Sequence, residues 1–150
     1  MTDLLLNIQT QIATIPEFKY VDEDWGQLDD YGMHAPVQWP CCLIDFSAAQ
    51  YTDIGKDKTA TPQNRQEATG SIGFTFANLR TTNSSAKALT AQKNTAWLLI
   101  GLIEEAHKKI HGFRPGTTSG GLIRSNFRRI KRDDGIQQYS VTYTLGLHNI

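Results

Sequence analysis

The sequence predicts an α+β domain, with an antiparallel sheet of about four long strands and an N-terminal helix and one long central helix packed on one face. Three observations predict this class. Two segments carry apolar residues at three- and four-residue intervals. Two others alternate between apolar and polar residues, and the elements follow the order helix, two strands, helix, two strands. A length of 150 residues, 39% of them hydrophobic, suits a single domain over residues 1–150.

The first helix is expected to begin at Thr2 or Asp3, either of which can cap its N-terminus. It is expected to end at Pro16, because a proline ring clashes with the preceding turn and lacks a donor. Its apolar face is formed by Leu5, Ile8, Ile12 and Ile15. The segment Glu17–Tyr31 that follows is acidic and is expected to be irregular and packed against the domain.

Two strands are expected next, at Cys41–Phe46 and Arg65–Leu79. Two prolines bracket the entry to the first strand, and the second alternates apolar and polar residues with period two. The polar stretch Ser47–Asn64 separates them. If the two strands pair, this stretch becomes a long hairpin arm that reaches beyond the core, which is typical of a functional loop.

The central helix is expected over Ser85–His111, with Asn83, Ser84 or Ser85 as its N-cap and Gly112 as its end. Its core stripe is Leu89, Ala96, Leu99, Ile100, Ile103, Ala106 and Ile110. A second set of residues makes the middle of this helix apolar nearly all round: Trp97, Leu98, Gly101 and Leu102. Such a helix is usually covered on both sides, and the second cover is expected to come from another subunit.

A closing hairpin completes the prediction. Its strands are Leu122–Arg132 and Ile136–Leu147, joined by the turn at Asp133, Asp134 and Gly135. The apolar residues of the first strand change parity, and a bulge near Arg128 and Arg129 would restore the alternation.

Composition excludes several classes of protein. Fifteen basic and fifteen acidic residues give a formal net charge of zero, which argues against an all-over basic nucleic-acid binder and against an acidic disordered tail. Cys41 and Cys42 are adjacent, which argues against a disulfide scaffold and favours a reducing compartment. No membrane span is expected, because the longest apolar run, Ala96–Ile103, is far shorter than about 20 residues. The N-terminal residues also do not fit a signal peptide.

Three sequence patterns resemble ligand-binding motifs, but each departs from the motif. His107 and His111 lie four apart on a helix, but Lys108 stands where a zinc protease needs glutamate. The acidic residues Asp22, Glu23, Asp24, Asp29 and Asp30 do not follow calcium-loop spacing. The loop Gly116–Gly121 does not have the Gly-Lys-Ser/Thr ending of a phosphate-binding loop. We therefore predict no catalytic residue, no metal and no cofactor.

The strongest functional signal is a separation of charge along the chain. Six of the fifteen basic residues fall within nineteen positions: Arg114, Arg124, Arg128, Arg129, Lys131 and Arg132. The acidic segment lies near the other end of the chain. Three interpretations stay open: a solvated strand face, a contact with the acidic segment of a neighbouring copy, and a contact with nucleic-acid phosphates. The predicted subunit-interface residues are Asp22, Glu23, Asp24, Trp97, Leu98, Leu102, Arg124, Arg128, Arg129 and Lys131.

This layout resembles the tail terminator and tail-completion (minor tail) proteins of tailed bacteriophages and prophages. The resemblance rests on element order, on length, and on the segments Thr2–Ile15, Cys41–Phe46, Ser85–His111 and Tyr139–Leu147. It implies a non-enzymatic structural protein that forms a hexameric ring at the end of the tail tube, where it stops tube polymerisation and offers a surface for head attachment.

The resemblance also implies partners and a location. The partners are further copies of the chain, tail tube proteins and head–tail connector proteins, with a transient contact to DNA in the lumen and none to a membrane. Assembly is expected in the cytoplasm of the bacterial host, and the mature location is the virion tail. The arm residues Lys56, Asp57 and Lys58 would lie at ring contacts or face the tube or its lumen.

Two other functions are kept as alternatives. The first is a nucleic-acid-binding module without sequence specificity, which would use Arg124, Arg128, Arg129 and Lys131. The second is an enzyme, which a deep pocket lined by the histidines or by the adjacent cysteines would favour.

Overall fold

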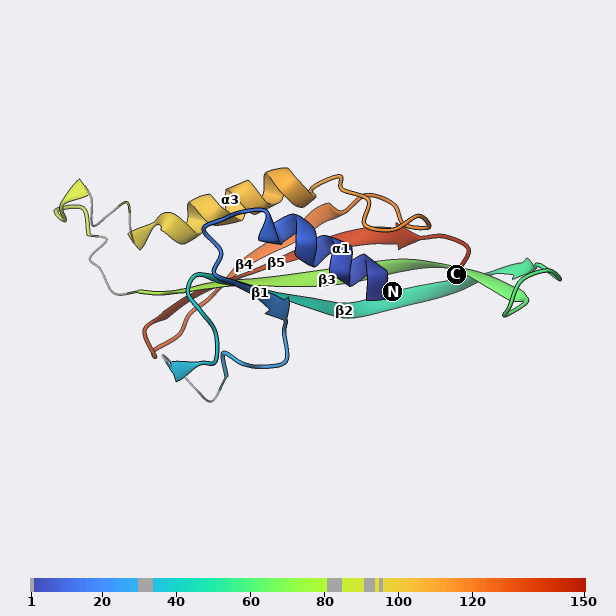
Figure 1. The fold of residues 1–150 in the computed structure, drawn as a ribbon, viewed down its shortest axis with the longest axis horizontal. Coiled ribbons are helices and arrows are strands. Elements are labelled where there is room, and N and C mark those ends of the chain that lie inside the picture. The colour runs from blue at the N-terminus through green and yellow to red at the C-terminus, as the bar shows by residue number, and fades with distance from the viewer. Residues whose placement is uncertain (1, 30–33, 81–84, 91–93, 95) are drawn as a thin grey trace.

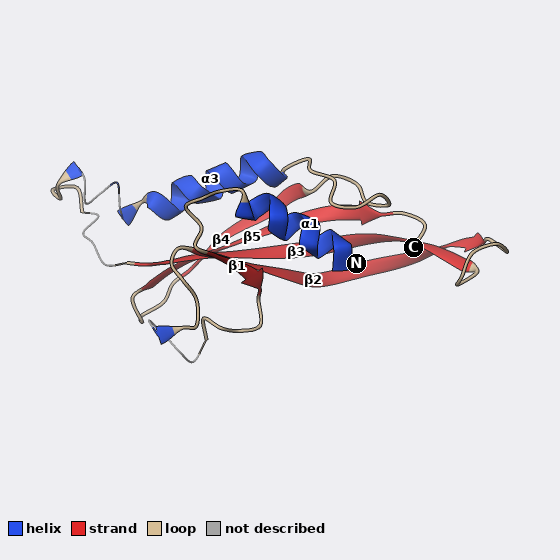
Figure 2. Cartoon of the chain, viewed as in Figure 1, coloured by secondary structure: helices blue, strands red, loops and turns tan. Residues whose placement is uncertain are grey.

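A computed structural model describes residues 2–29, 34–80, 85–90, 94 and 96–150. Two helices lie on one face of a five-stranded sheet, so the α+β class is confirmed (Figures 1 and 2). The elements are α1 (Thr2–Ala13), β1 (Tyr20–Glu23), β2 (Cys41–Lys56), β3 (Asn64–Leu79), α3 (Leu98–Ile110), β4 (Ile123–Ile130) and β5 (Ile136–Leu147). The order of the strands across the sheet is β1-β2-β3-β5-β4.

The sheet has one strand more than predicted, and that strand makes it mixed. β1 runs parallel to β2, with Tyr20 opposite Cys41 and Glu23 opposite Ile44. All other pairings are antiparallel, as expected. The segment predicted as irregular therefore contains a short edge strand. Its sequence, Tyr-Val-Asp-Glu, shows little strand character because only four residues pair and two of them are acidic.

The main core lies between the helices and one face of the sheet. Alternate residues of β3 and β5 point into it, including Ile72, Phe74, Val141 and Tyr143, each at most 1% exposed. The rings of Phe74 and Tyr143 meet edge to face, with their centroids 5.4 Å apart. The buried residues of α1 are Leu4, Ile8 and Ile12. The period-two pattern of these strands thus marks the buried face.

A smaller cluster covers one end of the opposite face. It joins Leu28 and Ala35, which come from the segment after β1, to residues of the sheet: Cys41, Leu43, Ala77 and Ile136. Both cysteines are free and fully buried, one facing each cluster. Burial raises the pKa of Cys41 to about 12 and the pKa of Cys42 well above its usual value. Both thiols therefore stay protonated at neutral pH and act as small core residues.

The hairpin arm is confirmed. β2 and β3 pair from Cys41 opposite Ala77 out to Lys56 opposite Asn64, so most of the polar stretch is paired strand. The ribbon extends well beyond the helices (Figure 1). Its base is held by two hydrogen bonds of 3.1 and 3.0 Å between the backbones of Gln66 and Ile150. This pairing satisfies the backbone hydrogen-bonding groups of residues that lie outside the core.

The central helix is shorter than predicted. α3 begins at Leu98, and Trp97 takes the N-cap position with φ −99° and ψ 6° and no side-chain cap. Among the described residues, Thr90, Asn94 and Ala96 are also helical, but the turn at Trp97 separates them from α3. Leu89 is 72% exposed, so it makes no buried contact that would hold this stretch in the helix, and threonine and asparagine favour helices weakly. Ser85 lies in a turn, and the other predicted caps, Asn83 and Ser84, fall outside the described residues.

The bulge in β4 lies earlier than predicted, between Arg124 and Asn126. Ser125 is the inserted residue, and its hydroxyl donates to the Thr142 carbonyl at 3.2 Å. The insertion brings Arg124, Phe127 and Arg129 opposite Tyr143, Val141 and Tyr139, which are the residues of β5 that face the helices. A bulge at this position gives one face of the edge strand an aromatic ring between two arginines.

Two glycines provide a matched test of this packing. A Cβ at Gly70 would lie 3.1 Å from the Phe46 ring and 3.3 Å from Leu145, whereas at Gly101 nothing lies within 4 Å. We expect Gly70→Val to lower the free energy of unfolding by about 1–3 kcal/mol through overpacking. Gly101→Ala, on the exposed face of α3, should raise it by about 0.5–1 kcal/mol. Urea denaturation measures both, and an unchanged midpoint for Gly70→Val would contradict the packing at this site.

Candidate assembly surfaces

The structure places the predicted acidic and basic residues at opposite edges of the sheet. Asp22 and Glu23 lie on β1, with Asp24 directly after it. Arg124, Arg128 and Arg129 lie on β4, with Lys131 directly after it. Because β1 and β4 are the first and last strands in the order, four strand-to-strand steps separate them. These two sets cannot meet each other within one chain.

Side chains cap the outer edge of β1. The Gln9 amide donates to the Val21 carbonyl at 2.8 Å, and the Gln27 amide donates to the Glu23 carbonyl at 3.0 Å. The Glu23 N–H donates to the Asp22 carboxylate at 2.8 Å. Gln27 is fully buried, and its amide oxygen accepts from the Trp25 N–H at 2.9 Å. A further strand could not pair along β1 without breaking these bonds.

The three carboxylates at this edge differ in the hydrogen bonds that they already accept. Asp22 also accepts a hydrogen bond from the Tyr20 hydroxyl at 2.7 Å, and burial together with this carboxylate raises the pKa of Tyr20. Asp24 accepts from the Gly26 N–H at 3.0 Å, which shapes the turn after the strand. The Glu23 side chain is exposed and has no hydrogen bond or ion pair within the described part of the chain. Glu23 is therefore the acidic group most available to a partner.

The edge strand β4 is exposed along nearly its whole length. Phe127 is 48% exposed and stacks on Tyr139 with ring centroids 5.4 Å apart. The guanidinium of Arg129 lies 5.7 Å from the centroid of the same tyrosine. Ile123 is 51% exposed. The sequence analysis named the arginines but did not name Phe127 and Ile123 as surface groups. Their position in a strand rich in arginine could have indicated that they are exposed.

Arg132 belongs to the basic segment but is bound within its own chain. Its guanidinium donates to the Asp134 carboxylate, at 2.6 Å for the shortest contact, to the Gln138 amide oxygen at 3.0 Å and to the Leu28 carbonyl at 2.6 Å. A longer ion pair of 3.6 Å joins it to Asp29. This arginine therefore holds the segment after β1 against the β4–β5 turn.

Two of the three predicted apolar contacts on α3 are exposed. Trp97 is 46% exposed and Leu98 is 40% exposed. Leu102 is 4% exposed and packs in the main core of its own chain, so grouping it with the surface pair was wrong. The reason is the helical period: Leu102 shares the buried stripe with Leu99 and Ala106, three and four residues away.

The two histidines of α3 form a small cluster with Tyr143. His107 Nδ1 lies 2.8 Å from the Tyr143 hydroxyl, and the His107 and His111 rings are 4.6 Å apart. Burial lowers the pKa of His107, and the nearby charges of Arg124 and His111 lower it further. Burial raises the pKa of Tyr143 to about 12. A cation beside Arg124 would be repelled, and among the described residues no three histidine, cysteine or acidic side chains gather as a metal site would require.

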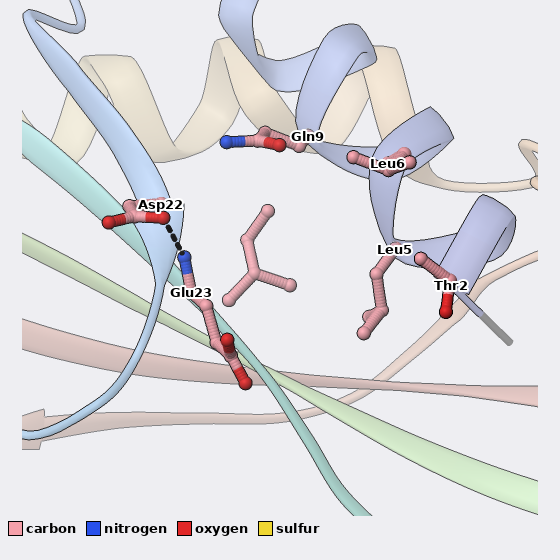
Figure 3. A pocket seen from close by; sticks show the side chains of 7 residues that line it. Thr2, Leu5, Leu6, Gln9, Asp22 and Glu23 are labelled. Atoms are coloured by element: carbon pink, nitrogen blue, oxygen red, sulfur yellow. Dashed lines mark hydrogen bonds between the residues drawn. The ribbon is translucent and has the colours of Figure 1, made fainter.

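A groove opens between α1 and β1 (Figure 3). Its volume is about 460 Å³. Leucine side chains of α1 lie on one side and carboxylates of β1 on the other, and the lining residues are Thr2, Leu5, Leu6, Gln9, Asp22, Glu23 and Ile44. Leu6 is 52% exposed. The groove offers an apolar surface with an acidic rim, which sequence reasoning did not predict because it joins a helix to a strand that had been missed.

The predicted contact residues of the arm lie at its far end. Lys56, Asp57 and Lys58 are all exposed. The Asp57 carboxylate accepts from the backbone N–H of Thr59 at 2.9 Å and from its hydroxyl at 2.6 Å, and these bonds lower the pKa of Asp57. The two lysines have no ion pair within the described residues. The tip presents its charges away from the rest of the fold.

Within the described residues, no helix has both the length and the apolar character that a membrane crossing needs.

Comparison with known proteins finds a likeness of fold. No family model matches the chain, and no curated protein matches it. The chain is similar in fold to a chain from a solved structure titled "Virion of native gene transfer agent (GTA) particle". The likeness covers 99% of this chain and 93% of that chain, with 7% sequence identity and a TM-score of 0.48.

The ion pair between Arg132 and Asp134 predicts a pH dependence of stability. Arg132 lowers the pKa of Asp134, so the carboxylate stabilises the fold above its ordinary pKa, near 4. That contribution is lost as the pH falls through the lowered value. We expect Asp134→Asn to lower the free energy of unfolding by about 1–3 kcal/mol at pH 7, and this difference from the wild type should shrink in acid.

The exposed neighbour Asp133 supplies the control, and Asp133→Asn should change stability by less than about 0.5 kcal/mol. Denaturation curves between neutral and acid pH measure all three proteins. A constant difference between wild type and Asp134→Asn at every pH would contradict the assignment.

Proposed function

We propose that this protein is a structural component of a phage-like virion, and specifically a tail terminator that forms a ring at the end of the tail tube. One observation carries the proposal: the sheet has an acidic edge at β1 and a basic edge at β4. The element order and the paired hairpin arm fit the resemblance described above. The role proposed is structural rather than enzymatic.

Opposite charges at opposite edges favour a head-to-tail contact. If two copies met through the same edge, arginines would face arginines or carboxylates would face carboxylates, and such contacts are unfavourable. A head-to-tail contact joins unlike edges, and it forms a ring when the rotation between successive copies closes on itself. The resemblance sets the expected number of copies at six. The proposed interface charges are Asp22, Glu23, Asp24, Arg124, Arg128, Arg129 and Lys131.

Exposed apolar side chains support the proposal that a partner covers part of this surface on assembly. Trp97 and Leu98 lie at the start of α3, and Ile123 and Phe127 lie on β4. Aromatic residues with arginine nearby are typical of protein interfaces. We propose that Trp97 and Leu98 contact a neighbouring subunit or a connector protein.

The hairpin arm is proposed to contact the tail tube or line the lumen through Lys56, Asp57 and Lys58. Its two lysines and one aspartate leave the tip only weakly basic. A surface that passes DNA should not bind phosphates strongly, because many neutralised phosphates would slow transit. The formal net charge of zero is compatible with this requirement.

Self-association is the direct test of the proposed ring. Native mass spectrometry at low ionic strength should show a defined oligomer, with six copies expected. Raising the salt from about 0.1 M to about 1 M shortens the Debye length from about 10 Å to about 3 Å, so the oligomer should weaken. Sedimentation velocity over a range of protein concentrations measures this. A chain that stays monomeric at high concentration and low salt would overturn the proposal.

A second candidate function rests on the exposed arginines of β4, which could bind nucleic-acid phosphates without reading bases. Fluorescence anisotropy with duplex and single-stranded DNA distinguishes the two. The nucleic-acid module predicts binding at low salt that falls steeply as salt rises and is lost in a variant with Arg124, Arg128 and Arg129 changed to glutamate. If no binding is measured at low salt, this alternative is excluded and the structural role stands.

A further inference from the structure

The helix-side face of β4 presents an aromatic ring between two guanidinium groups. The bulge at Ser125 sets the register, so Arg124, Phe127 and Arg129 all lie opposite core-facing residues of β5. Yet α3 does not cover Phe127, which is 48% exposed. The Arg124 N–H donates to His111 at 3.3 Å, and no other strand of the described chain pairs with the outer side of β4. The strand is open to a partner along its edge.

The other edge of the sheet is open only in part. β1 pairs with β2 from Cys41 to Ile44, and side chains cap β1 itself. From Asp45 onward, β2 continues to Lys56 with β3 as its single strand partner among the described residues. The groove between α1 and β1 lies where this uncovered stretch begins, and Ile44 of β2 forms part of its lining. A strand added beside β2 would therefore pass next to the groove.

The two edges are compatible in strand direction and in the side of the sheet on which their contact groups lie. β2, β3, β5 and β4 form successive antiparallel pairs, so β4 runs antiparallel to β2 within the chain. If a second copy is placed in the same orientation beside the first, its β4 runs antiparallel to the uncovered part of β2. The helices of both copies then lie on the same side. Phe127 and the groove are both on that side, since Ile44 and Val141 belong to the same core.

We propose that the groove between α1 and β1 receives Phe127 from β4 of a second copy of this chain, with the neighbour's Arg129 against Glu23. The proposal rests on the ring proposed above and identifies its subunit contact. The phenyl ring would pack against Leu5, Leu6 and Ile44. The neighbour's Arg129 would meet Glu23, whose side chain has no hydrogen bond or ion pair within the described residues. The neighbour's β4 pairs with β2, because the edge of β1 is capped.

Charge complementarity selects this occupant. The groove carries two carboxylates and apolar carbon, and β4 carries arginines on either side of an exposed aromatic ring. Two β4 strands paired with each other would place arginines on arginines. In a second copy, β4 supplies both the positive charge and the aromatic ring. Within each copy, β4 lies at the edge of the sheet opposite the groove.

Charge reversal at the two surfaces tests the pairing. Glu23→Arg and Arg129→Glu should each weaken self-association by about tenfold or more, and combining them in one chain should restore it, since close interfacial charge pairs are coupled this strongly. The restored double variant also shows that neither change acts by unfolding the chain. Lys109→Glu, at an exposed position of α3, changes the charge by the same amount as Arg129→Glu and should leave association within about threefold of the wild type. Sedimentation velocity measures the four variants and the wild type.

Disulfide trapping tests the position of the ring. Leu6→Cys and Phe127→Cys place thiols on the two proposed partners, and both native cysteines are buried. Mixing the two variants under mild oxidation should give a cross-linked dimer, whereas each variant alone should not, because a head-to-tail contact brings position 6 to position 127. Circular dichroism confirms that each variant is folded.

The outcomes separate the two proposals. An oligomer that survives both charge reversals and gives no mixed disulfide overturns this contact and leaves the ring in place. A wild-type chain that is monomeric at high concentration overturns the ring and the contact together. Rescue by the double variant, together with the mixed disulfide, supports both.

Discussion

The ladder between β3 and β5 is the interaction on which the rest of the structure depends. It joins two hairpins that are distant in sequence, in an unbroken register from Ala68 opposite Leu147 to Leu79 opposite Ile136. The side chains that it turns toward the helices form the centre of the core. By holding β2 on one side and β4 on the other, this ladder also sets the acidic and basic edges apart. The charge separation on which the proposed assembly depends is therefore a consequence of core packing.

The acidic segment has two roles, one within its own chain through Arg132 and one at the exposed edge of β1. Asp29 and the Leu28 carbonyl bind Arg132, so one part of the segment stabilises its own chain. Glu23 stays exposed, and the strand that carries it is tied down by Gln9 and Gln27. A charge held on a fixed strand loses little freedom when a partner binds, so it contributes more to a contact than the same charge on a loop.

The sequence predicted best those elements whose side chains obey one period. β3 and β5 match their predicted ranges to within one residue, because alternate residues such as Phe74 and Val141 must enter the same core. β1 was missed because its strand character comes from pairing with β2 rather than from its own residues. The start of α3 was placed too early because Leu89 continues the helical period but has no core to pack against. Local pattern cannot show which apolar residues a distant segment will cover.

The candidate surfaces were predictable in composition but not in position. The charged residues were named from the sequence, and their function as an interface stays a prediction. The bulge at Ser125 decided which residues of β4 share a face, and a bulge placed after Phe127 instead of before it would put Phe127 and Arg124 on opposite sides of the sheet. The groove depends on α1 meeting β1, a contact between a helix and a strand that sequence analysis had not joined. Both features follow from non-local pairing.

The hydrogen bonds that Gln9, Asp22 and Gln27 make to β1 have a consequence for the free subunit in solution. An unprotected border strand is a template on which unrelated or misfolded chains can deposit, and amyloid grows in this way. Here the outer edge of β1 is capped, and β4 at the opposite edge of the sheet carries arginines that repel one another. Both features disfavour non-specific strand pairing at these edges, so the free subunit resists deposition of wrong chains and keeps its surfaces for the proposed neighbour.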